Sequence, residues 1–370
     1  MNSIDRSTAN TVDEVRVPLA ALKGRGSATR MAHRFERDQR ERFDDGWEHD
    51  QEDPAAAPRT EVSWETARSV IASNESPDIY FGRSINPYRG CEHGCIYCYA
   101  RPTHSYLNLS PGLDFETKLI AKRNVVEQLR AEIGRKGYQP ELLAIGTVTD
   151  CYQPVERELR LTRGIIELLH ETNHPFALVT KSTGVERDID LIAPLARQGL
   201  ASVFVTITTL DGELARRLEP RAAAPHRRLR ILRTLAEHGI PCGVSLAPQI
   251  PFLNDDMEQV LEAAWDAGAR EAFYQVLRLP WEVAPLFREW LEVHYPQRAQ
   301  RVMARVQDMR GGKDYDSDFA TRMKGSGTWA ALIGQRFRKA VARHGFNARK
   351  VEFRTDLFRP PGPQGQGSLF

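Results

Sequence analysis

Residues 86–102 read NPYRGCEHGCIYCYARP and bring Cys91, Cys95 and Cys98 into one short loop. Three residues separate the first two cysteines, and two separate the last two. Three thiolates at this spacing can hold three corners of a cubic 4Fe-4S cluster, whereas the two-cluster ferredoxin pattern needs a fourth cysteine and other spacings. One iron would then lack a protein ligand, which is the open position that metal chemistry requires. The alternative is a zinc knuckle in which His93 or a distant residue is the fourth ligand.

The composition indicates a protein with room for a large core. The chain has 370 residues, 41% of them hydrophobic, a net charge of +2 and five cysteines. No apolar run approaches the roughly 18 residues of a membrane helix, and the start, MNSIDRSTANTVDEV, lacks the apolar segment of a secretory signal. Collagen, coiled-coil and membrane-spanning classes are therefore excluded. We expect a cytoplasmic protein without a membrane partner, in which clustered cysteines bind metal rather than form disulfides.

Short apolar runs alternate with helical patterns through the middle of the chain. The helical patterns carry apolar residues three and four positions apart within 125–133, 161–169, 191–195, 229–235 and 260–264. The strand candidates between them are 142–148, 175–180, 201–208, 242–248 and 271–277. With a first strand before Cys91, these make six β/α units and predict an α/β fold with a parallel sheet. Six units favour a partial (β/α)6 barrel over a doubly wound sheet, and in either fold reactive groups lie at the C-terminal ends of the strands.

The chain divides into four predicted parts. Residues 1–57 are polar, and we expect a largely disordered arm because they cannot bury enough apolar surface to offset their ordering entropy. Residues 58–280 contain the barrel with its cysteine loop. Residues 281–358 are helical and basic, and they predict a C-terminal extension on or beside the barrel. Residues 359–370, RPPGPQGQGSLF, predict a flexible tail.

The cysteine spacing, with an aromatic residue at Tyr97, resembles the radical S-adenosylmethionine (SAM) superfamily. More narrowly, residues 85–124 resemble a group of uncharacterised bacterial proteins related to spore photoproduct lyase and described as DNA repair photolyase-like. The similarity runs from about residue 25 to the end and is densest over 84–260. It implies a partial six-unit barrel, a 4Fe-4S cluster on Cys91, Cys95 and Cys98, and an open iron that chelates SAM. Reduction of the cluster would cleave SAM to methionine and a 5′-deoxyadenosyl radical.

The resemblance also implies residues that hold SAM. Tyr97 matches the position beside the adenine, or it packs under the loop. Lys181 would pair with the SAM carboxylate as a compact charge, or it is a solvated lysine at a strand end. Thr149 and Asp150 take the place of the Gly-Gly-Glu-Pro-like segment of many members, although Asp150 equally suits a role in capping its own loop. Thr206, with Thr208 on the same face of its strand, matches a hydroxyl position near the SAM carboxylate and ribose, or it only fills the barrel.

Cys151 is a weak catalytic candidate. Photoproduct lyases return a hydrogen atom to the product radical from a cysteine whose matching position here is Thr147. Cys151 lies four residues further along, so a buried thiol without a catalytic role is the favoured interpretation. The resemblance does not make this chain a spore photoproduct lyase.

Two basic stretches suggest a nucleic-acid substrate. Residues 215–233 hold seven arginines and one acidic residue, Glu219, and residues 334–350 hold six lysines and arginines with Phe337 and Phe346 between them. Basic surfaces with aromatic residues suit phosphates and exposed bases, although a charged helix face is more often simply solvated.

The last five residues suggest a second partner. Gln366, Gly367, Ser368, Leu369 and Phe370 form QGSLF, which resembles the short peptide that binds the bacterial sliding clamp. Docking of this end on its own domain is the alternative.

The leading hypothesis is a radical SAM enzyme that repairs or modifies DNA, with RNA as the second choice of substrate. Its cluster would be reduced by an electron donor such as flavodoxin or ferredoxin. Radical modification of a protein or peptide is the second hypothesis. An iron-sulfur or zinc-binding interaction protein is the non-enzyme alternative. The sequence does not name the bond that changes.

Overall fold

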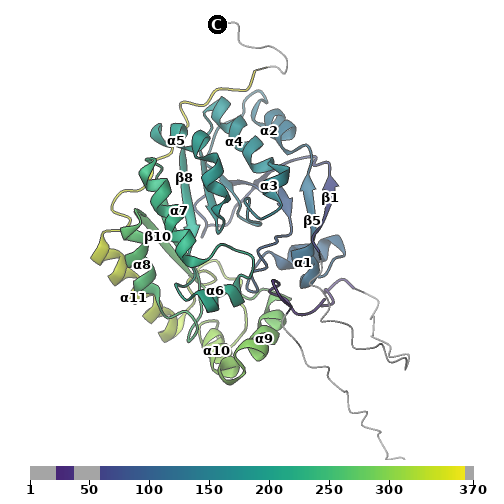
Figure 1. The fold of residues 1–370 in the computed structure, drawn as a ribbon, viewed down its shortest axis with the longest axis vertical. Coiled ribbons are helices and arrows are strands. Elements are labelled where there is room, and N and C mark those ends of the chain that lie inside the picture. The colour runs from purple at the N-terminus through teal and green to yellow at the C-terminus, as the bar shows by residue number, and fades with distance from the viewer. Residues whose placement is uncertain (1–21, 37–58, 363–370) are drawn as a thin grey trace, which may run out of the picture.

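The computed structural model describes residues 22–36 and 59–362 of the chain. Its main sheet contains six parallel strands in the order in which they occur along the chain, and an antiparallel strand lies at one edge (Figure 1). The strands are β2 (Ile71–Ser73), β3 (Arg83–Ile85), β6 (Leu143–Ile145), β7 (Phe176–Thr180), β8 (Ala201–Thr206), β9 (Cys242–Gln249) and β10 (Glu271–Val276). The order never reverses, and the sheet starts at β10 and ends at β2. The fold is therefore an open, partial barrel, and the doubly wound alternative is wrong.

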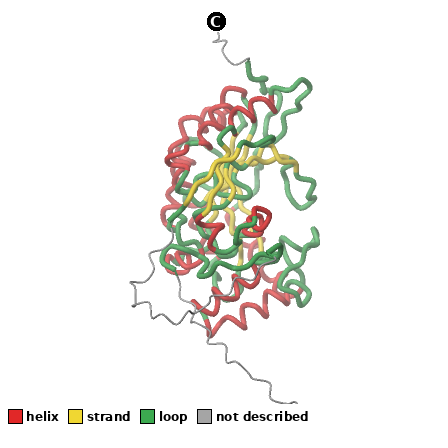
Figure 2. Tube along the Cα trace, turned by 90° about the vertical axis from the view of Figure 1, so that its right-hand side faces the viewer, coloured by secondary structure: helices red, strands yellow, loops and turns green. Residues whose placement is uncertain are grey.

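Five helices connect the strands and cover the outer face of the sheet: α2 (Val125–Ile133), α4 (Leu161–Thr172), α5 (Ile189–Arg197), α7 (Pro225–Glu237) and α8 (Met257–Asp266). Their apolar faces form one core with the strands, whose central residues, such as Leu178 and Val203, are fully or almost fully buried. In Figure 2 the strands run through the middle, with a layer of helices on one side and mainly loops on the other. Strands buried on both faces explain why the sequence shows continuous apolar runs rather than alternation.

A second, three-stranded sheet was missed by the sequence analysis. It joins β1 (Glu61–Glu65), β5 (Lys118–Lys122) and β4 (Tyr88–Arg89) in the order β1-β5-β4. β1 is half-exposed to exposed along its length and β4 has two residues, so neither gives an apolar run. The cysteine loop begins directly after β4, and this small sheet therefore fixes where the loop starts.

The C-terminal extension packs on the barrel in two places. Helices α9 (Val283–His294) and α10 (Pro296–Asp308) share a separate apolar cluster with Cys95, Ile96 and Tyr97, so they cover the cysteine loop. Helix α11 (Gly327–His344) lies against α8 and β10. At the end of the described chain, the N-H of Arg359 donates to the carbonyl of Thr172 at 2.8 Å, so the expected tail starts on the domain surface. Residues 363–370, with the QGSLF peptide, lie outside the described residues.

Residues 22–36, hereafter the strap, differ from the expectation of a disordered arm. Ser27 and His33 are buried at 1% and 5% exposure. Arg34 forms an ion pair with Glu282 at 2.9 Å, and the hydroxyl of Thr29 donates to Glu289 at 3.0 Å. Buried polar contacts, which hydropathy does not reveal, hold this segment in place. The remaining residues of the arm lie outside the described part of the chain.

No helix in the described residues combines the length and apolar character needed to cross a membrane.

Four short helices complete the connections between the strands and the cysteine loop: α1 (Leu113–Thr117), α3 (Glu156–Leu159), α6 (Gly212–Leu218) and the 3-10 helix η2 (Thr183–Asp188). A second 3-10 helix, η1 (Arg101–Leu107), follows the cysteine loop directly.

Candidate functional site

The three cysteines lie on one anchored loop at the C-terminal end of the sheet. Cys91 and Cys95 are buried, and Cys98 is half-buried. The N-H of Cys91 donates to the carbonyl of Phe115 at 2.9 Å, and the N-H of Ile96 donates to Leu218 at 3.1 Å. Residues that follow the ends of β6, β7 and β8 all reach this loop, as described below. The structure thus brings the predicted metal ligands together where parallel-sheet folds carry their reactive groups.

Arg101 holds the loop from behind, and the sequence analysis did not identify it. Its fully buried guanidinium donates to the carbonyls of Cys95 and Gly94 at 3.0 and 3.2 Å, and it pairs with the buried Glu116 at 2.5 Å. A buried charge is tolerated when it is paired and fully hydrogen-bonded. The arginine therefore fixes the backbone of the loop without using a cysteine.

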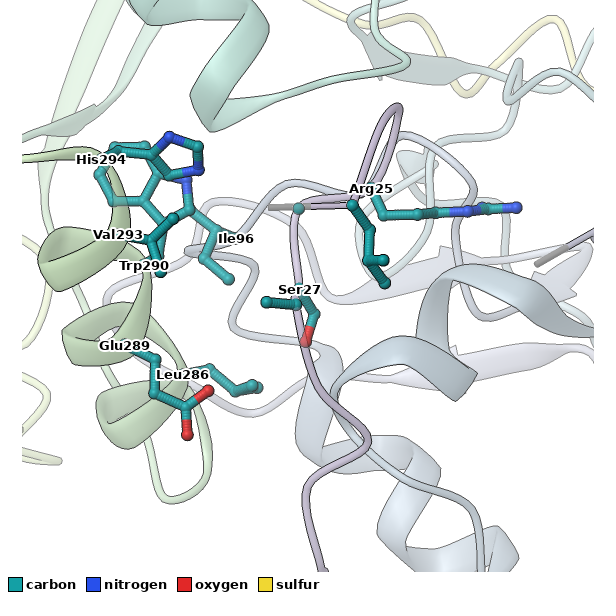
Figure 3. Close-up of a pocket in the computed structure, with 11 residues that line it drawn as sticks. Arg25, Ser27, Ile96, Leu286, Glu289, Trp290, Val293 and His294 are labelled. Atoms are coloured by element: carbon teal, nitrogen blue, oxygen red, sulfur yellow. The ribbon is translucent and has the colours of Figure 1, made fainter. Parts of the chain in front are cut away.

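The strap completes this support. The N-H groups of Gly26 and Ser27 donate to the carboxylate of Glu116 at 3.0 and 2.9 Å. A Cβ atom on Gly26 would lie 1.8 Å from the carbonyl oxygen of Gly94, so only glycine fits where the strap crosses the loop. Figure 3 shows the strap facing α9, with Ile96 between them, around a small cavity lined by Arg25, Ser27, Glu289 and Trp290.

The environment of the thiols suits a cationic cluster. Burial, and then the nearby charges of Asp150, Cys95 and Cys98, raises the pKa of the Cys91 thiol well above its usual range. Burial likewise raises the pKa of Cys95 to about 12. Three thiolates this close together need positive charge, which bound iron supplies as it displaces the protons. Among the described residues, no three Cys, His, Asp or Glu side chains, the loop cysteines included, converge on a single-ion site.

Lys181 and Tyr97 lie beside the loop. Lys181 follows β7 directly, and its ammonium lies 5.9 Å from the centre of the Tyr97 ring. Within the described residues no carboxylate forms an ion pair with this ammonium. Burial opposes its charge, but the nearby Cys95 and Glu219 outweigh burial and raise the pKa of Lys181. The half-buried lysine is therefore a charged group beside the cysteine loop, with no ion-pair partner among the described residues.

Glu219 is a residue of the site that the sequence analysis saw only as the one acid among seven arginines. It is buried after α6, and it accepts hydrogen bonds from the hydroxyls of Tyr97 and Thr208, the latter at 2.5 Å. It also pairs with the buried Arg228. Arg228 and Lys181 lower the pKa of Glu219 to about 2 against the effect of burial. The sequence signal for this role was that Glu219 is the one acidic residue among seven arginines, because an arginine that is buried needs an acidic partner.

The Asp150 carboxylate joins two segments of the protein through hydrogen bonds and is not an exposed acceptor for a ligand. Its carboxylate accepts the N-H groups of Tyr152 and Lys181 at 2.9 and 2.7 Å and the hydroxyl of Thr180 at 2.8 Å. His93 Nδ1 lies 3.3 Å from the same carboxylate. The local-capping alternative therefore describes Asp150, which joins the cysteine loop to the end of β7.

The two threonines are buried at the same end of the sheet. The Thr149 hydroxyl donates to the carbonyl of Tyr88 at 3.3 Å. Thr206 is the last residue of β8, and its carbonyl accepts a hydrogen bond from Arg228 at 3.0 Å. Thr206 thus adjoins the group around Lys181 and Glu219, whereas the Thr149 hydroxyl is engaged by the backbone of β4, just before the cysteine loop.

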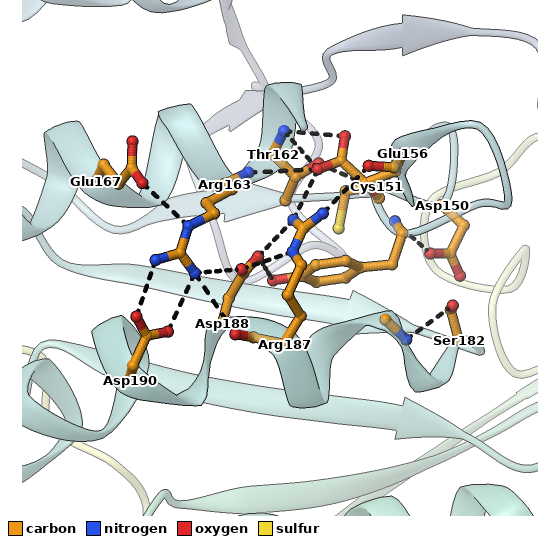
Figure 4. A network of polar contacts seen from close by, with 12 residues as sticks. Asp150, Cys151, Glu156, Thr162, Arg163, Glu167, Ser182, Arg187, Asp188 and Asp190 are labelled. Atoms are coloured by element: carbon orange, nitrogen blue, oxygen red, sulfur yellow. Dashed lines mark hydrogen bonds and ion pairs between the residues drawn. The ribbon is translucent and has the colours of Figure 1, made fainter. Parts of the chain in front are cut away.

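Cys151 does not join the site. It is fully buried in the main hydrophobic core, next to a network of charged residues that includes Glu156 and Arg187 (Figure 4). Burial, with smaller effects from Asp150 and Glu156, raises the pKa of its thiol well above the usual range. The carbonyl of Cys151 accepts the Thr162 hydroxyl at 2.6 Å. This surrounding fits the structural interpretation of Cys151 and gives the catalytic one no support.

The two basic stretches are partly used inside the protein. Arg217, Arg221, Arg228 and Arg336 form ion pairs with acidic residues of the domain. Phe337 and Phe346, expected to contact bases, are buried at 8% and 4% exposure. They pack against Tyr274 and Trp265. The expectation of base-stacking aromatics in this stretch is therefore wrong, because the rings of Phe337 in α11 and Phe346 just after it pack against the barrel.

Comparison with known proteins identifies the domain. Residues 85–264 match the profile of the radical SAM superfamily. The chain contains a radical SAM domain. The chain is 38% identical over 224 residues to an uncharacterized protein of Mycobacterium tuberculosis, a match that covers 60% of this chain and 66% of the relative. An uncharacterized protein of Methanocaldococcus jannaschii is 29% identical over 214 residues, covering 58% and 76%. This chain thus spans just under two thirds of the mycobacterial relative.

Among solved structures, a cysteine-to-serine variant of spore photoproduct lyase is similar, with a TM-score of 0.51 and 16% identity over 76% of this chain and 79% of that chain. The same enzyme complexed with a dinucleoside spore photoproduct has a TM-score of 0.50 and 15% identity. At these identities the likeness concerns the fold, and it agrees with the open barrel described above.

Proposed function

We propose that the protein is a radical SAM enzyme in which Cys91, Cys95 and Cys98 hold a 4Fe-4S cluster and SAM binds beside Tyr97 and Lys181. The supporting observation is a buried loop with three thiols next to an ammonium that has no ion-pair partner among the described residues. The superfamily match over residues 85–264 supports the same assignment.

The roles of the chain's own residues follow from their contacts. When bound, the cluster would supply the electron that cleaves SAM reductively to methionine and a 5′-deoxyadenosyl radical. Lys181 would pair with the SAM carboxylate as a point charge. Arg101 and Glu116 keep the loop backbone fixed, and the packing of α9 and α10 against Ile96 excludes water from behind the cysteines. The protein's task is thus orientation and a dry site, while the cofactors carry the difficult step.

Nucleic acid is the proposed substrate class. One of the similar solved structures is spore photoproduct lyase complexed with dinucleoside spore photoproduct. In the first basic stretch Arg216, Arg227, Arg230 and Arg233 are exposed, and no acidic residue in the described parts of the chain forms an ion pair with them. Exposed, unpaired arginines suit contacts to phosphates. Modification of a protein or peptide is the competing function, and a cytoplasmic setting with a flavodoxin or ferredoxin donor belongs to the same proposal.

The test is anaerobic reconstitution with iron and sulfide, followed by incubation with SAM and a chemical reductant. The proposal predicts 5′-deoxyadenosine, detected by mass spectrometry, with a rate that rises when oligonucleotides are added. Reductive cleavage that responds to peptides and not to oligonucleotides would favour the competing function. A protein that binds iron but neither binds nor cleaves SAM would be the non-enzyme alternative.

We also propose that QGSLF binds the bacterial sliding clamp, with Gln366 and Ser368 as polar contacts and Leu369 and Phe370 as the apolar ones. Burying each apolar side chain is worth about 1.5 to 3 kcal/mol. A clamp contact would raise the local concentration of the enzyme near DNA. Binding of purified clamp to the full chain should be lost when Leu369 and Phe370 are both replaced by alanine. Equal affinity of both chains would refute the contact.

A further inference from the structure

Arg278 lies two residues beyond the end of β10, close to the cysteine loop. Its guanidinium carbon is 5.3 Å from the centre of the ring of Tyr99, the residue that directly follows Cys98. Tyr99 itself is 44% exposed, and its hydroxyl donates to the carbonyl of Thr147. An arginine held over an exposed aromatic ring presents both a charge and a stacking face to solvent.

The hydrogen-bonding capacity of this arginine is largely unused. A guanidinium has five N-H donors, yet the side-chain hydrogen bond recorded for Arg278 goes to the weak acceptor Met323 Sδ at 3.3 Å. Its Nε is buried without a partner, and no carboxylate of the described residues forms an ion pair with it. Buried donors are normally satisfied, so an exception needs an explanation.

A second arginine whose Nε lacks a hydrogen-bond partner lies nearby. Arg310 is 2% exposed and donates to the carbonyls of Leu277, Thr321 and Arg322, but its Nε also lacks a partner. Burial, and then the like charge of Arg278, lowers the pKa of Arg310 to about 10. Across the described residues, four buried side-chain polar atoms have no partner, and two of them belong to this pair. The two arginines repel each other, and neither forms an ion pair with a carboxylate of the described residues; Asp316 acts on Arg310, and Asp78 on Arg278, only from beyond ion-pair distance.

A neighbouring arginine, Arg322, does have its charge neutralised by an acidic side chain. Arg322 pairs with Asp78 in two contacts of 2.5 and 2.6 Å. Arg278, Lys181 and Arg322 all act electrostatically on the Tyr99 hydroxyl. Tyr99 therefore lies within electrostatic reach of both Arg278 and Lys181, the residue assigned above to the SAM carboxylate.

We propose that Arg278, backed by Arg310 and flanked by Tyr99, is a subsite for a phosphodiester group of a nucleic-acid substrate. The planar fork of arginine matches the oxygens of a phosphate, and an exposed tyrosine beside it offers a surface on which a base stacks. The subsite lies next to Cys98, so a nucleotide held there is presented to the cluster side of the barrel. This inference rests on the proposed function and names the contact that would position its substrate.

The test uses the full-length reconstituted protein and a fluorescent single-stranded oligonucleotide, with affinity measured over a range of salt concentrations. Arg278→Gln should weaken binding about tenfold and reduce the magnitude of the salt slope by about 0.7, the value for one phosphate contact on a single strand. Arg278→Lys keeps the charge and loses the fork, so it should keep the slope and lose part of the affinity. Arg197→Gln, at an exposed arginine at the end of α5 and outside both basic stretches, is the matched control and should change affinity and salt slope by less.

Iron content, SAM affinity and melting temperature are measured on each variant and should match the unmodified protein. If Arg278→Gln binds the oligonucleotide as the unmodified protein does, the subsite is refuted while the nucleic-acid target stands. If the unmodified protein binds no oligonucleotide, the target class is refuted as well. If inorganic phosphate or a mononucleotide competes as strongly as an oligonucleotide, the site takes a free phosphate and the phosphodiester assignment is wrong.

Discussion

The ammonium of Lys181 lies 5.9 Å from the centre of the Tyr97 ring, and Tyr97 in turn donates its hydroxyl to the buried Glu219. These contacts connect the end of β7, the cysteine loop and the segment after α6. They leave Lys181 charged beside the cysteine loop, without an ion-pair partner among the described residues.

Lys181→Ala should weaken SAM binding and leave the cluster intact, because the proposed function pairs Lys181 with the SAM carboxylate and not with the iron. Truncating one partner of a desolvated charge pair costs about 2 to 5 kcal/mol, so the dissociation constant should rise at least about tenfold. Equilibrium dialysis with labelled SAM measures it, and Lys339→Ala, exposed on α11, serves as the control. An unchanged constant would return Lys181 to the role of a solvated lysine.

Glu219→Gln should destabilise the fold strongly. The substitution leaves the guanidinium of Arg228 buried at 1% exposure without its acid, and removing one partner of a buried pair costs about 3 to 5 kcal/mol. Glu213→Gln breaks the exposed pair with Arg217 and should cost under about 1 kcal/mol. Urea unfolding of both variants gives the comparison, and equal losses would contradict the buried role of Glu219.

Most of the barrel could be predicted from the sequence. The runs beginning at residues 142, 175, 201, 242 and 271 contain β6 to β10, because strands buried on both faces need continuous apolar residues. The supports of the site could not be predicted. Arg101 and Glu116 meet through a tertiary contact between two polar residues, and such a pair leaves no periodic pattern. The strap was missed for the same reason, since Gly26 contacts residues about 70 and 90 positions away.

Gly26→Ala should loosen the cysteine loop. The added methyl group would collide with the carbonyl of Gly94, so the strap or the loop must move. We expect less iron per chain after reconstitution and faster loss of the cluster's visible absorbance in a chelator. Gly212→Ala is the control, because nothing lies within 4 Å of its new Cβ. Identical cluster retention in the two variants would show that the strap does not support the loop.

His174 should make stability depend on pH. It is fully buried, its Nδ1 lies 3.0 Å from the carbonyl of Pro175, and its Nε2 lies 2.8 Å from the Tyr138 hydroxyl. Burial lowers the pKa of His174 to about 4, against the opposing effect of the Pro175 hydrogen bond. The unfolded chain takes up the proton near pH 6.5, so this stabilisation is complete above that pH and is lost as the pH falls toward 4.

The loss should amount to roughly 3 kcal/mol across that interval, from about 1.4 kcal/mol for each unit of pKa difference. Denaturant titrations between pH 4 and 7 measure it on the protein and on His174→Gln, which lacks the titrating group. The variant should show a flatter pH dependence, whereas His226→Gln, at an exposed position, should follow the unmodified protein. A slope unchanged by His174→Gln would show that another group governs the acid range.

The central claim is that Cys91, Cys95 and Cys98 together hold a cluster with one iron open to SAM. The most direct measurement is electron paramagnetic resonance of the reduced, reconstituted protein with and without SAM, combined with iron and sulfide analysis. The account predicts about four irons per chain and a spectrum that shifts on adding SAM, both retained in Cys242→Ala and both lost when the three loop cysteines are replaced by alanine. Full iron content in the triple variant, or a spectrum that SAM leaves unchanged, would contradict it.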